Sequence, residues 1–321
     1  MYRIGVDLGG TNIAVGLVSN SNGIFKLENK LSRPTGRERA GEYIVADIAE
    51  ACRELCAEAG IELKDIEAIG VATPGIANHD EGIVEYANNL KFKHFPLAKM
   101  LSEQLGFENV HIENDANAAA WGEAVAGAAA GSKNSVMITL GTGVGGGIII
   151  DNKIYSGFNY AGAELGHIVI HYNGRQCSCG RKGCWEAYSS ATGLINMTRE
   201  KIAESEAAGE QTLMSKIAEE RGKINGRTAF DAMRLGDKAA EEVVDEYISY
   251  LACGIANIIN IFQPEILTIG GGISNEGQLL LDLLLPEVRK EQYGCGFVPL
   301  TDIRIAKLGN DAGIIGAAML V

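Results

Sequence analysis

Residues 2–19 read YRIGVDLGGTNIAVGLVS, two apolar runs joined by a turn that contains adjacent glycines. Apolar residues of high strand propensity on both sides of a glycine turn predict a β-hairpin. The same pattern recurs at residues 135–151, which read SVMITLGTGVGGGIIID. We call these segments glycine hairpin 1 and glycine hairpin 2. A device that recurs far along one chain predicts two related halves.

Helix-like segments lie between and after these hairpins. Apolar residues recur at helical spacing over residues 38–59 and 237–262, and the second run stops before Pro264. A third glycine cluster, at 270–272, follows an apolar run at 265–269 and precedes another helix-like segment. Strands, glycine turns and helices in this order predict an α/β architecture with two lobes.

The composition is that of an ordinary globular protein. The chain has 321 residues, of which 46% are hydrophobic and 21% charged, and this length suits two lobes. It contains neither a basic leader with a cleavage site nor the roughly 18 uninterrupted apolar residues of a membrane span. We therefore expect a cytoplasmic protein. The formal net charge of −13 argues against nucleic-acid or anionic-membrane partners, so an anionic substrate would need local backbone donors or a metal ion.

Residues 177–186 read CSCGRKGCWE and form what we call the cysteine loop. Gly180 and Gly183 permit the positive-φ turns that a tight ligand loop requires. Closely spaced cysteines in a chain without an export signal favour metal binding, most simply of zinc. The alternatives are a disulfide with a spare thiol, or three small buried residues. The nearest candidates for a fourth ligand are His167 and His171.

The glycine turns invite a phosphate-binding interpretation, although the common motifs fail. The sequence has no P-loop, and the glycines at 141–146 lead into an isoleucine-rich strand where a dinucleotide motif would open a helix. What remains is a hairpin tip whose amides, with the hydroxyls of Thr11 and Thr142, hold phosphate oxygens. A plain turn is the alternative for each hairpin taken alone.

Two carboxylates stand at the ends of predicted strands. Asp7 ends an apolar run, where an unpaired charge is costly, and a Mg²⁺ ion with its waters would offset that cost. Asp115 lies between a strand-like run and an alanine-rich helix-like run, so either Asn114 or Asp115 would cap the helix. A carboxylate at a helix N-terminus is favoured in its ionised form, which suits a proton acceptor.

These segments together resemble a known family. ELGH at 164–167, followed by the cysteine loop, resembles the signature of the ROK family of bacterial sugar kinases and sugar-responsive repressors. The runs at 7–12, 140–143 and 269–272 resemble the two phosphate segments and the adenosine segment of the actin-like ATPase superfamily. The resemblance implies a ribonuclease H-like, hexokinase-type fold with a cleft between two lobes. We place the small lobe at 1–118 plus 306–321 and the large lobe at 119–305.

The resemblance also implies an activity, ATP-dependent phosphorylation of a hexose, most simply of glucose at its 6-hydroxyl. Asp115 would take the proton of that hydroxyl, and Asp7 would face Mg²⁺ through water. The implied sugar contacts are Asn114, Asp115, Glu164, His167 and Glu186. The implied ATP and phosphate residues are Asp7, Gly9, Gly10, Thr11, Asn12, Gly141, Thr142, Gly143, Gly271 and Gly272. The expected zinc ligands are His167, Cys177, Cys179 and Cys184, and the metal would orient His167 and Glu186 towards the sugar.

Two departures from the family pattern bear on the choice of sugar. Ala72 stands where the family usually has a glycine, and Leu90-Lys91-Phe92 replaces Leu-Gly-Trp. N-acetylmannosamine or another hexose is therefore the alternative substrate. A sugar-sensing repressor without its DNA-binding domain is the alternative function, disfavoured because repressors carry that domain ahead of hairpin 1 and tend to lose its phosphate residues. The expected partners are a small sugar, Mg-ATP and further copies of the chain, as a dimer or tetramer.

Overall fold

The computed structural model describes residues 1–21 and 23–320, so Asn22 and Val321, the last residue of the predicted small lobe, lie outside the described residues. The chain forms two compact units. Unit 1 comprises Met1–Met137, Gly147–Ala163 and Lys307–Val321, and unit 2 comprises Ile138–Gly146 and Glu164–Ala306. Unit 1 thus includes residues 119–137 and 147–163, which the predicted lobes assign elsewhere. The lobe bounds stay a prediction.

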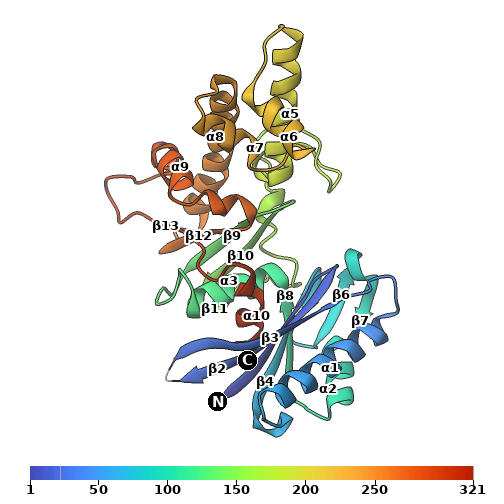
Figure 1. The fold of residues 1–321 in the computed structure, drawn as a ribbon. Helices are drawn as coiled ribbons and strands as arrows, with labels where there is room; N and C mark the ends of the chain where they lie inside the picture. Colours follow the sequence, from blue (N-terminus) through green and yellow to red (C-terminus); the bar gives the residue numbers. More distant parts are fainter. Residues whose placement is uncertain (22, 321) are drawn as a thin grey trace. The chain divides into compact units, whose positions relative to one another are not determined.

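Unit 1 is built on a five-stranded sheet in the order β3-β2-β1-β4-β8 (Figure 1). The strands are β1 (Tyr2–Leu8), β2 (Asn12–Ser21), β3 (Ile24–Pro34), β4 (Ile66–Thr73) and β8 (Val110–Asn114). β1 and β2 pair antiparallel from Tyr2 with Ser19 to Leu8 with Ile13, which confirms hairpin 1. β4 runs parallel to both β1 and β8. Asp7 and Asn114 therefore stand at the same carboxyl edge of the sheet, where α/β proteins bind ligands.

Four helices pack on this sheet. They are α1 (Gly41–Glu58), α2 (Leu97–Leu105), α3 (Asp115–Ala126) and α10 (Ala312–Ala318). α1 falls within the predicted 38–59, and its Cys52 and Cys56 are buried in the hydrophobic core, where cysteine packs as a small apolar residue. α10 packs closely against the opposite face of the sheet, because Gly5 and Gly70 have no side chain there. A Cβ there would lie 1.8 Å from the Ile314 and Ala317 carbonyl oxygens.

A smaller antiparallel sheet completes unit 1. It consists of β5 (Ile76–Asn78), β6 (Ile83–Ala87) and β7 (Phe92–Phe95). Both departures from the family pattern lie beside it, because β5 follows the end of β4 and residues 88–91 join β6 to β7. Lys91 adopts φ 56°, a left-handed conformation that glycine enters more easily than lysine. The lysine thus keeps the backbone shape for which a glycine is suited.

The second five-stranded sheet has the order β11-β10-β9-β12-β13. Its strands are β9 (Ser135–Leu140), β10 (Val144–Ile150), β11 (Lys153–Ile154), β12 (Ile266–Gly270) and β13 (Asp302–Ile305). Both sheets have the same order of strands across the sheet. Three strands that are consecutive in the chain lie side by side, with the first of them in the centre, and the next two strands of the sheet follow on the other side of that first strand. β10 pairs antiparallel with β11, and β12 pairs parallel with β13. This shared order supports the prediction of two related halves.

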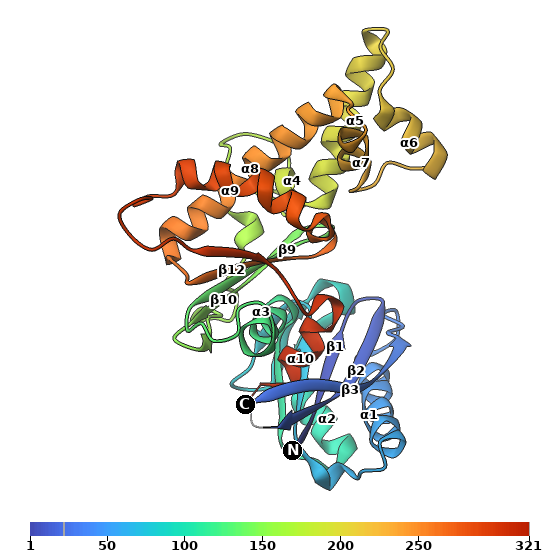
Figure 2. The ribbon, with the colours of Figure 1, turned by 60° about the vertical axis from the view of Figure 1, so that its left-hand side comes forward.

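Unit 2 is otherwise mainly helical. Its helices are α4 (Glu186–Ser189), α5 (Ala191–Ala207), α6 (Leu213–Arg221), α7 (Thr228–Arg234), α8 (Lys238–Phe262) and α9 (Gln278–Glu291). α8 and α9 run side by side (Figure 2). Asp237 caps α8 by accepting from the amides of Ala239 and Ala240 at 2.9 and 3.2 Å, and α8 ends just before Gln263 and Pro264. The helix predicted over 237–262 is confirmed. Among the described residues, no helix is long and apolar enough to cross a membrane.

Candidate active site

Asp7 and the candidate phosphate residues of hairpin 1 line a pocket of about 590 Å³. Hairpin 1 supplies its turn, β3 supplies one wall, and the residues before α10 supply another. The lining residues include Asp7, Gly9, Gly10, Thr11, Asn12, Lys30, Asn310 and Asp311. The turn itself is closed by a 2.9 Å hydrogen bond from the Gly9 amide to the Asn12 carbonyl. All the phosphate residues predicted in hairpin 1 therefore face one cavity.

Asp7 lies half-buried in this pocket, near the start of α10. Its Oδ2 is so close to the α10 backbone that a Cβ on Gly313 would lie 3.0 Å away. Burial, and secondly the charge of Asp115, raises the pKa of Asp7 to about 6. A cation at this edge would relieve both effects by favouring the ionised form. The arrangement therefore fits a Mg²⁺ ion, for which oxygen ligands are preferred.

Asn114 is the cap of α3. Its Oδ1 accepts from the amides of Ala116 at 2.9 Å and Asn117 at 3.2 Å, and its Nδ2 donates to the Gly75 carbonyl at 3.0 Å. Asp115 is the first helical residue and is exposed, with Oδ1 accepting from the Ala116 amide at 2.8 Å. Of the two caps that the sequence left open, the structure selects Asn114. Asp115 is therefore not needed to begin the helix.

In unit 2, four potential metal ligands converge. The ligand atoms of His167, Cys177, Cys179 and Cys184 all lie within 4.8 Å of one another. The Cys179 and Cys184 sulfurs are 3.6 Å apart, and the Cys177 sulfur is 3.8 Å from His167 Nδ1. Zinc bound tetrahedrally by thiolates at about 2.3 Å spaces its ligands about 3.8 Å apart. The site therefore fits zinc, with the Nε2 of His167 left for another partner.

The alternatives for the cysteine loop are not what the structure contains. All three cysteines are free, which excludes the disulfide from this structure, and Cys179 is exposed. Gly180 and Gly183 have φ of 90° and 83°, as the loop requires. His171 lies outside the ligand group, and its Nδ1 is 3.4 Å from the Tyr188 hydroxyl. Burial, and secondly the neighbouring Cys179 and Cys177, raises the pKa of the Cys184 thiol, and a bound metal cation would favour its thiolate form.

The remaining candidates of unit 2 lie around hairpin 2 and the cysteine loop. Glu186 begins α4, and its two carboxylate oxygens accept from the Val144 amide and the Ser178 hydroxyl, each at 3.1 Å. Glu164 is exposed, and its carbonyl accepts from the His167 amide at 3.0 Å. Gly271 has φ 82° and lies so close to β9 that a Cβ would be 2.6 Å from the Leu140 backbone. The predicted adenosine segment thus packs beside the start of the hairpin 2 turn.

Comparison with known proteins identifies the family of the chain. The model of the ROK family matches residues 3–321. The chain belongs to the ROK family. It is 38% identical over 319 residues to a glucokinase of Thermotoga maritima, covering 99% of this chain and 96% of that protein. A glucokinase of Streptomyces coelicolor is 37% identical over 317 residues, which cover 99% of this chain and 96% of that protein.

Solved structures agree with the family assignment. A ROK family glucokinase from Streptomyces griseus, crystallised with glucose and AMPPNP, superimposes with a TM-score of 0.78 at 34% identity. The match covers 99% of this chain and 98% of that one. The fold of this ROK protein is therefore α/β and of the two-lobed actin-like ATPase type, as the sequence predicted.

Several residues beside the predicted site received no role from the sequence. Glu113 is buried, and it accepts from the Asn114 amide at 2.8 Å, from Asn117 Nδ2 at 3.1 Å and from His79 Nδ1 at 3.1 Å. The hydrogen bond with Glu113 raises the pKa of His79. Glu113 thereby supports the junction at which Asp115 stands. The only sequence signal is a lone acidic residue between the apolar Ile112 and the cap.

Lys30 and Asp311 form an ion pair of 2.7 Å that lines the pocket of unit 1, beside the predicted phosphate residues. Sequence reasoning assigned neither residue. A usable signal existed for Asp311, because the tripeptide Asn-Asp-Ala occurs at 114–116 and again at 310–312, each time where a helix starts. This repeat matches the repeated strand order of the two sheets.

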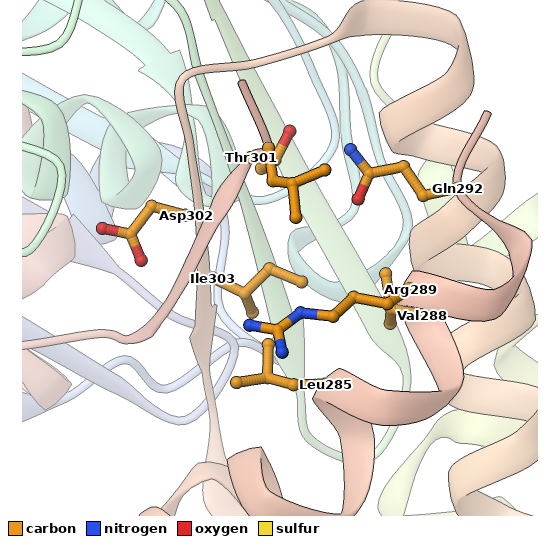
Figure 3. Close-up of a pocket in the computed structure, with 8 residues that line it drawn as sticks. Leu285, Val288, Arg289, Gln292, Thr301, Asp302 and Ile303 are labelled. Atoms are coloured by element: carbon orange, nitrogen blue, oxygen red, sulfur yellow. The ribbon is translucent and has the colours of Figure 1, made fainter. Parts of the chain in front are cut away.

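Another pocket lies in unit 2, away from the predicted site residues. It measures about 80 Å³ and lies between α9 and β13. Figure 3 shows Arg289 extending from α9 towards the apolar Ile303 and Gln292, which follows α9, extending towards Thr301, while Asp302 points the other way. None of the predicted site residues lines this pocket.

We expect about one zinc ion per chain, held by His167, Cys177, Cys179 and Cys184. Cys179→Ser should lose most of this metal, because a hydroxyl replaces one thiolate of an otherwise complete tetrahedral set. Metal analysis of protein purified without chelator measures the stoichiometry. Cys253→Ser is the matched control, since Cys253 lies on α8 outside the ligand group. Absence of stoichiometric zinc from the parent protein would refute the site.

Proposed function

We propose that this chain is an ATP-dependent glucokinase that transfers the γ-phosphoryl group of ATP to the 6-hydroxyl of glucose. The observation that carries the proposal is the combination of chain-long similarity to glucokinases with one local arrangement. Asp115 stands exposed at the start of α3, and the pKa of Asp7 in the phosphate pocket is raised first by burial and secondly by the charge of Asp115. A proton acceptor and a candidate magnesium ligand are thus electrostatically coupled.

In the proposed reaction, Asp115 accepts a hydrogen bond from the 6-hydroxyl and takes its proton as phosphoryl transfer proceeds. The Asn114 cap and buried Glu113 keep this carboxylate at the helix start. General base catalysis of this kind contributes about 10²- to 10⁴-fold. Thr11 and the amides of hairpins 1 and 2 hold the β- and γ-phosphates, and Gly271 and Gly272 border the adenosine. Positioning and charge neutralisation supply most of the remaining acceleration.

Two metals would complete this arrangement. Asp7 would hold Mg²⁺ through water, and the ion would neutralise charge on the phosphates. Zinc would be structural. His167, bound through one ring nitrogen, would be fixed with its other nitrogen towards a sugar hydroxyl. Glu164, Glu186 and Asn114 would complete the hydroxyl contacts, and a site that bonds each hydroxyl rejects analogues that lack one.

Compartment and assembly belong to the same proposal. We place the enzyme in the cytoplasm as a homodimer or homotetramer. A sugar-sensing role without catalysis is the competing function, and it predicts sugar binding with no turnover of ATP. The phosphate pocket of unit 1, with Asp7, Thr11 and the Lys30–Asp311 pair around it, favours the kinase because a pure sensor has no use for it.

Glucose should be the preferred acceptor in a panel that includes mannose, N-acetylmannosamine, N-acetylglucosamine, fructose and allose. The sugar-contact set is complete, and the alternatives differ mainly near the 2-position. The segments around Ala72 and Lys91, where the chain departs from the family pattern, are the expected determinants there. kcat/KM measured with Mg-ATP decides the question. A competitor that exceeds glucose by more than about tenfold, or about 1.4 kcal/mol in transition-state binding, would overturn the choice of glucose.

A further inference from the structure

Glu186 contacts two functional segments at once. Its Oε2 accepts from the Val144 amide, at the end of the hairpin 2 turn, at 3.1 Å. Its Oε1 accepts from the Ser178 hydroxyl at 3.1 Å and lies 3.6 Å from the Cys177 sulfur, both in the cysteine loop. A carboxylate has about four lone-pair positions, so these contacts leave acceptor capacity for a sugar hydroxyl. Sugar contact alone does not explain the bond to hairpin 2.

The segment that begins at Glu186 holds the same turn at two further points. The Ala191 amide donates to the Gly141 carbonyl at 2.8 Å. The Thr192 hydroxyl donates to the Thr142 carbonyl at 2.7 Å. Together with the Glu186 contact, these bonds reach residues 141, 142 and 144. The turn is therefore fastened along its length to residues 186–192, which start two residues after the metal ligand Cys184.

The fit between Glu186 and the turn is close. A Cβ built on Gly143 would lie 2.2 Å from Glu186 Oε2, well inside the van der Waals contact distance. A side chain at 143 would therefore displace this carboxylate from the turn, whereas the backbone conformation sets no such demand, because Gly143 does not have a positive φ. The turn and the carboxylate occupy mutually dependent positions.

We propose that Glu186 is a positioning residue for the phosphate-binding turn of hairpin 2, and that it couples this turn to the cysteine loop, which carries the predicted zinc ligands. The Val144 amide is committed to Glu186, which leaves the amides of Thr142 and Gly143 to be presented to the phosphates. The inference rests on the proposed function for the identity of the nucleotide. It differs from a sugar-contact role because it predicts an effect on nucleotide binding when no sugar is present.

The test is the affinity of the full chain for AMPPNP with Mg²⁺ and without sugar, measured by calorimetry. Glu186→Ala removes the acceptor and should weaken AMPPNP binding by about tenfold or more. Glu186→Gln keeps the chain length and an acceptor oxygen for Val144, so AMPPNP affinity should stay within about threefold. Its glucose KM should still rise, because the charge at the sugar is lost. Zinc content measured on each variant shows that the metal has not been removed.

Thr192→Val is an independent variant, because Thr192 is neither a predicted sugar contact nor a metal ligand. It removes only the bond to the Thr142 carbonyl, so KM for ATP should rise about threefold or more while KM for glucose stays unchanged. AMPPNP affinity that is unaltered in both Glu186→Ala and Thr192→Val would overturn the inference and leave Glu186 a sugar contact. A parent chain that binds AMPPNP but phosphorylates no sugar would refute the proposed function alone, and the affinities would still test the coupling.

Discussion

Asp115→Asn is expected to lower kcat by about 10²- to 10⁴-fold or more while glucose binding changes little. The amide has nearly the shape of the carboxylate and can still accept from the Ala116 amide and a sugar hydroxyl, but it cannot take the proton. α3 should be unaffected because its cap is Asn114. Turnover at saturating glucose and the Kd for glucose, measured separately, distinguish loss of chemistry from loss of binding.

Two further variants control this experiment. Asp115→Ala should also lose turnover with little change in the free energy of unfolding, because the cap remains. Asn114→Ala should instead destabilise the protein by about 1 kcal/mol, the usual cost of a lost cap, in addition to losing the bond to Gly75. Retention of turnover within a few-fold in Asp115→Asn would show that Asp115 is not the base.

Asp7→Asn is expected to stabilise the nucleotide-free protein above pH 6 while it impairs catalysis. Folding raises the pKa of Asp7 from 3.8 to about 6, so the unfolded chain ionises this group more readily than the folded one does. The resulting penalty is absent below about pH 3.8, grows between the two values and is complete above about pH 6. The difference corresponds to about 3 kcal/mol, which Asn avoids because it carries no charge.

Urea unfolding without nucleotide or Mg²⁺ measures this effect. Asp7→Asn should exceed the parent in free energy of unfolding by up to about 3 kcal/mol at pH 8, and the gain should shrink towards zero near pH 4. Asp311→Asn is the matched control, because Asp311 lines the same pocket but pairs with Lys30 at 2.7 Å and should give no gain. Equal free energies of unfolding of Asp7→Asn and the parent at pH 8 would contradict the raised pKa of Asp7 in the folded protein. Mg-ATP should stabilise the parent more than Asp7→Asn.

Choices between neighbouring residues show where sequence reasoning stopped. Asn114 and Asp115 are both residue types that cap helices well. In the structure Asn114 is the cap, and its side chain also donates to the carbonyl of Gly75, 39 residues away. His167 and His171 are both within reach of the cysteine loop, but the backbone brings only His167 to it, while His171 lies against Tyr188. In each case the two residues are equally suited by their local sequence, and packing against a distant segment decides which of them takes the role.

The sequence by itself determined the elements whose causes are local. Apolar runs around glycine turns specify hairpin 1, the Asp237 cap and Pro264 delimit α8, and the spacing of the cysteine loop predicts a metal site. Tertiary structure alone decided the contacts between distant residues, such as Glu113 with His79, Lys30 with Asp311 and Glu186 with Val144. These pairs are 34, 281 and 42 residues apart, and no periodicity or propensity relates such positions. They meet because both strands and helices must bury their apolar faces, and the polar groups at the edges pair where that packing leaves them.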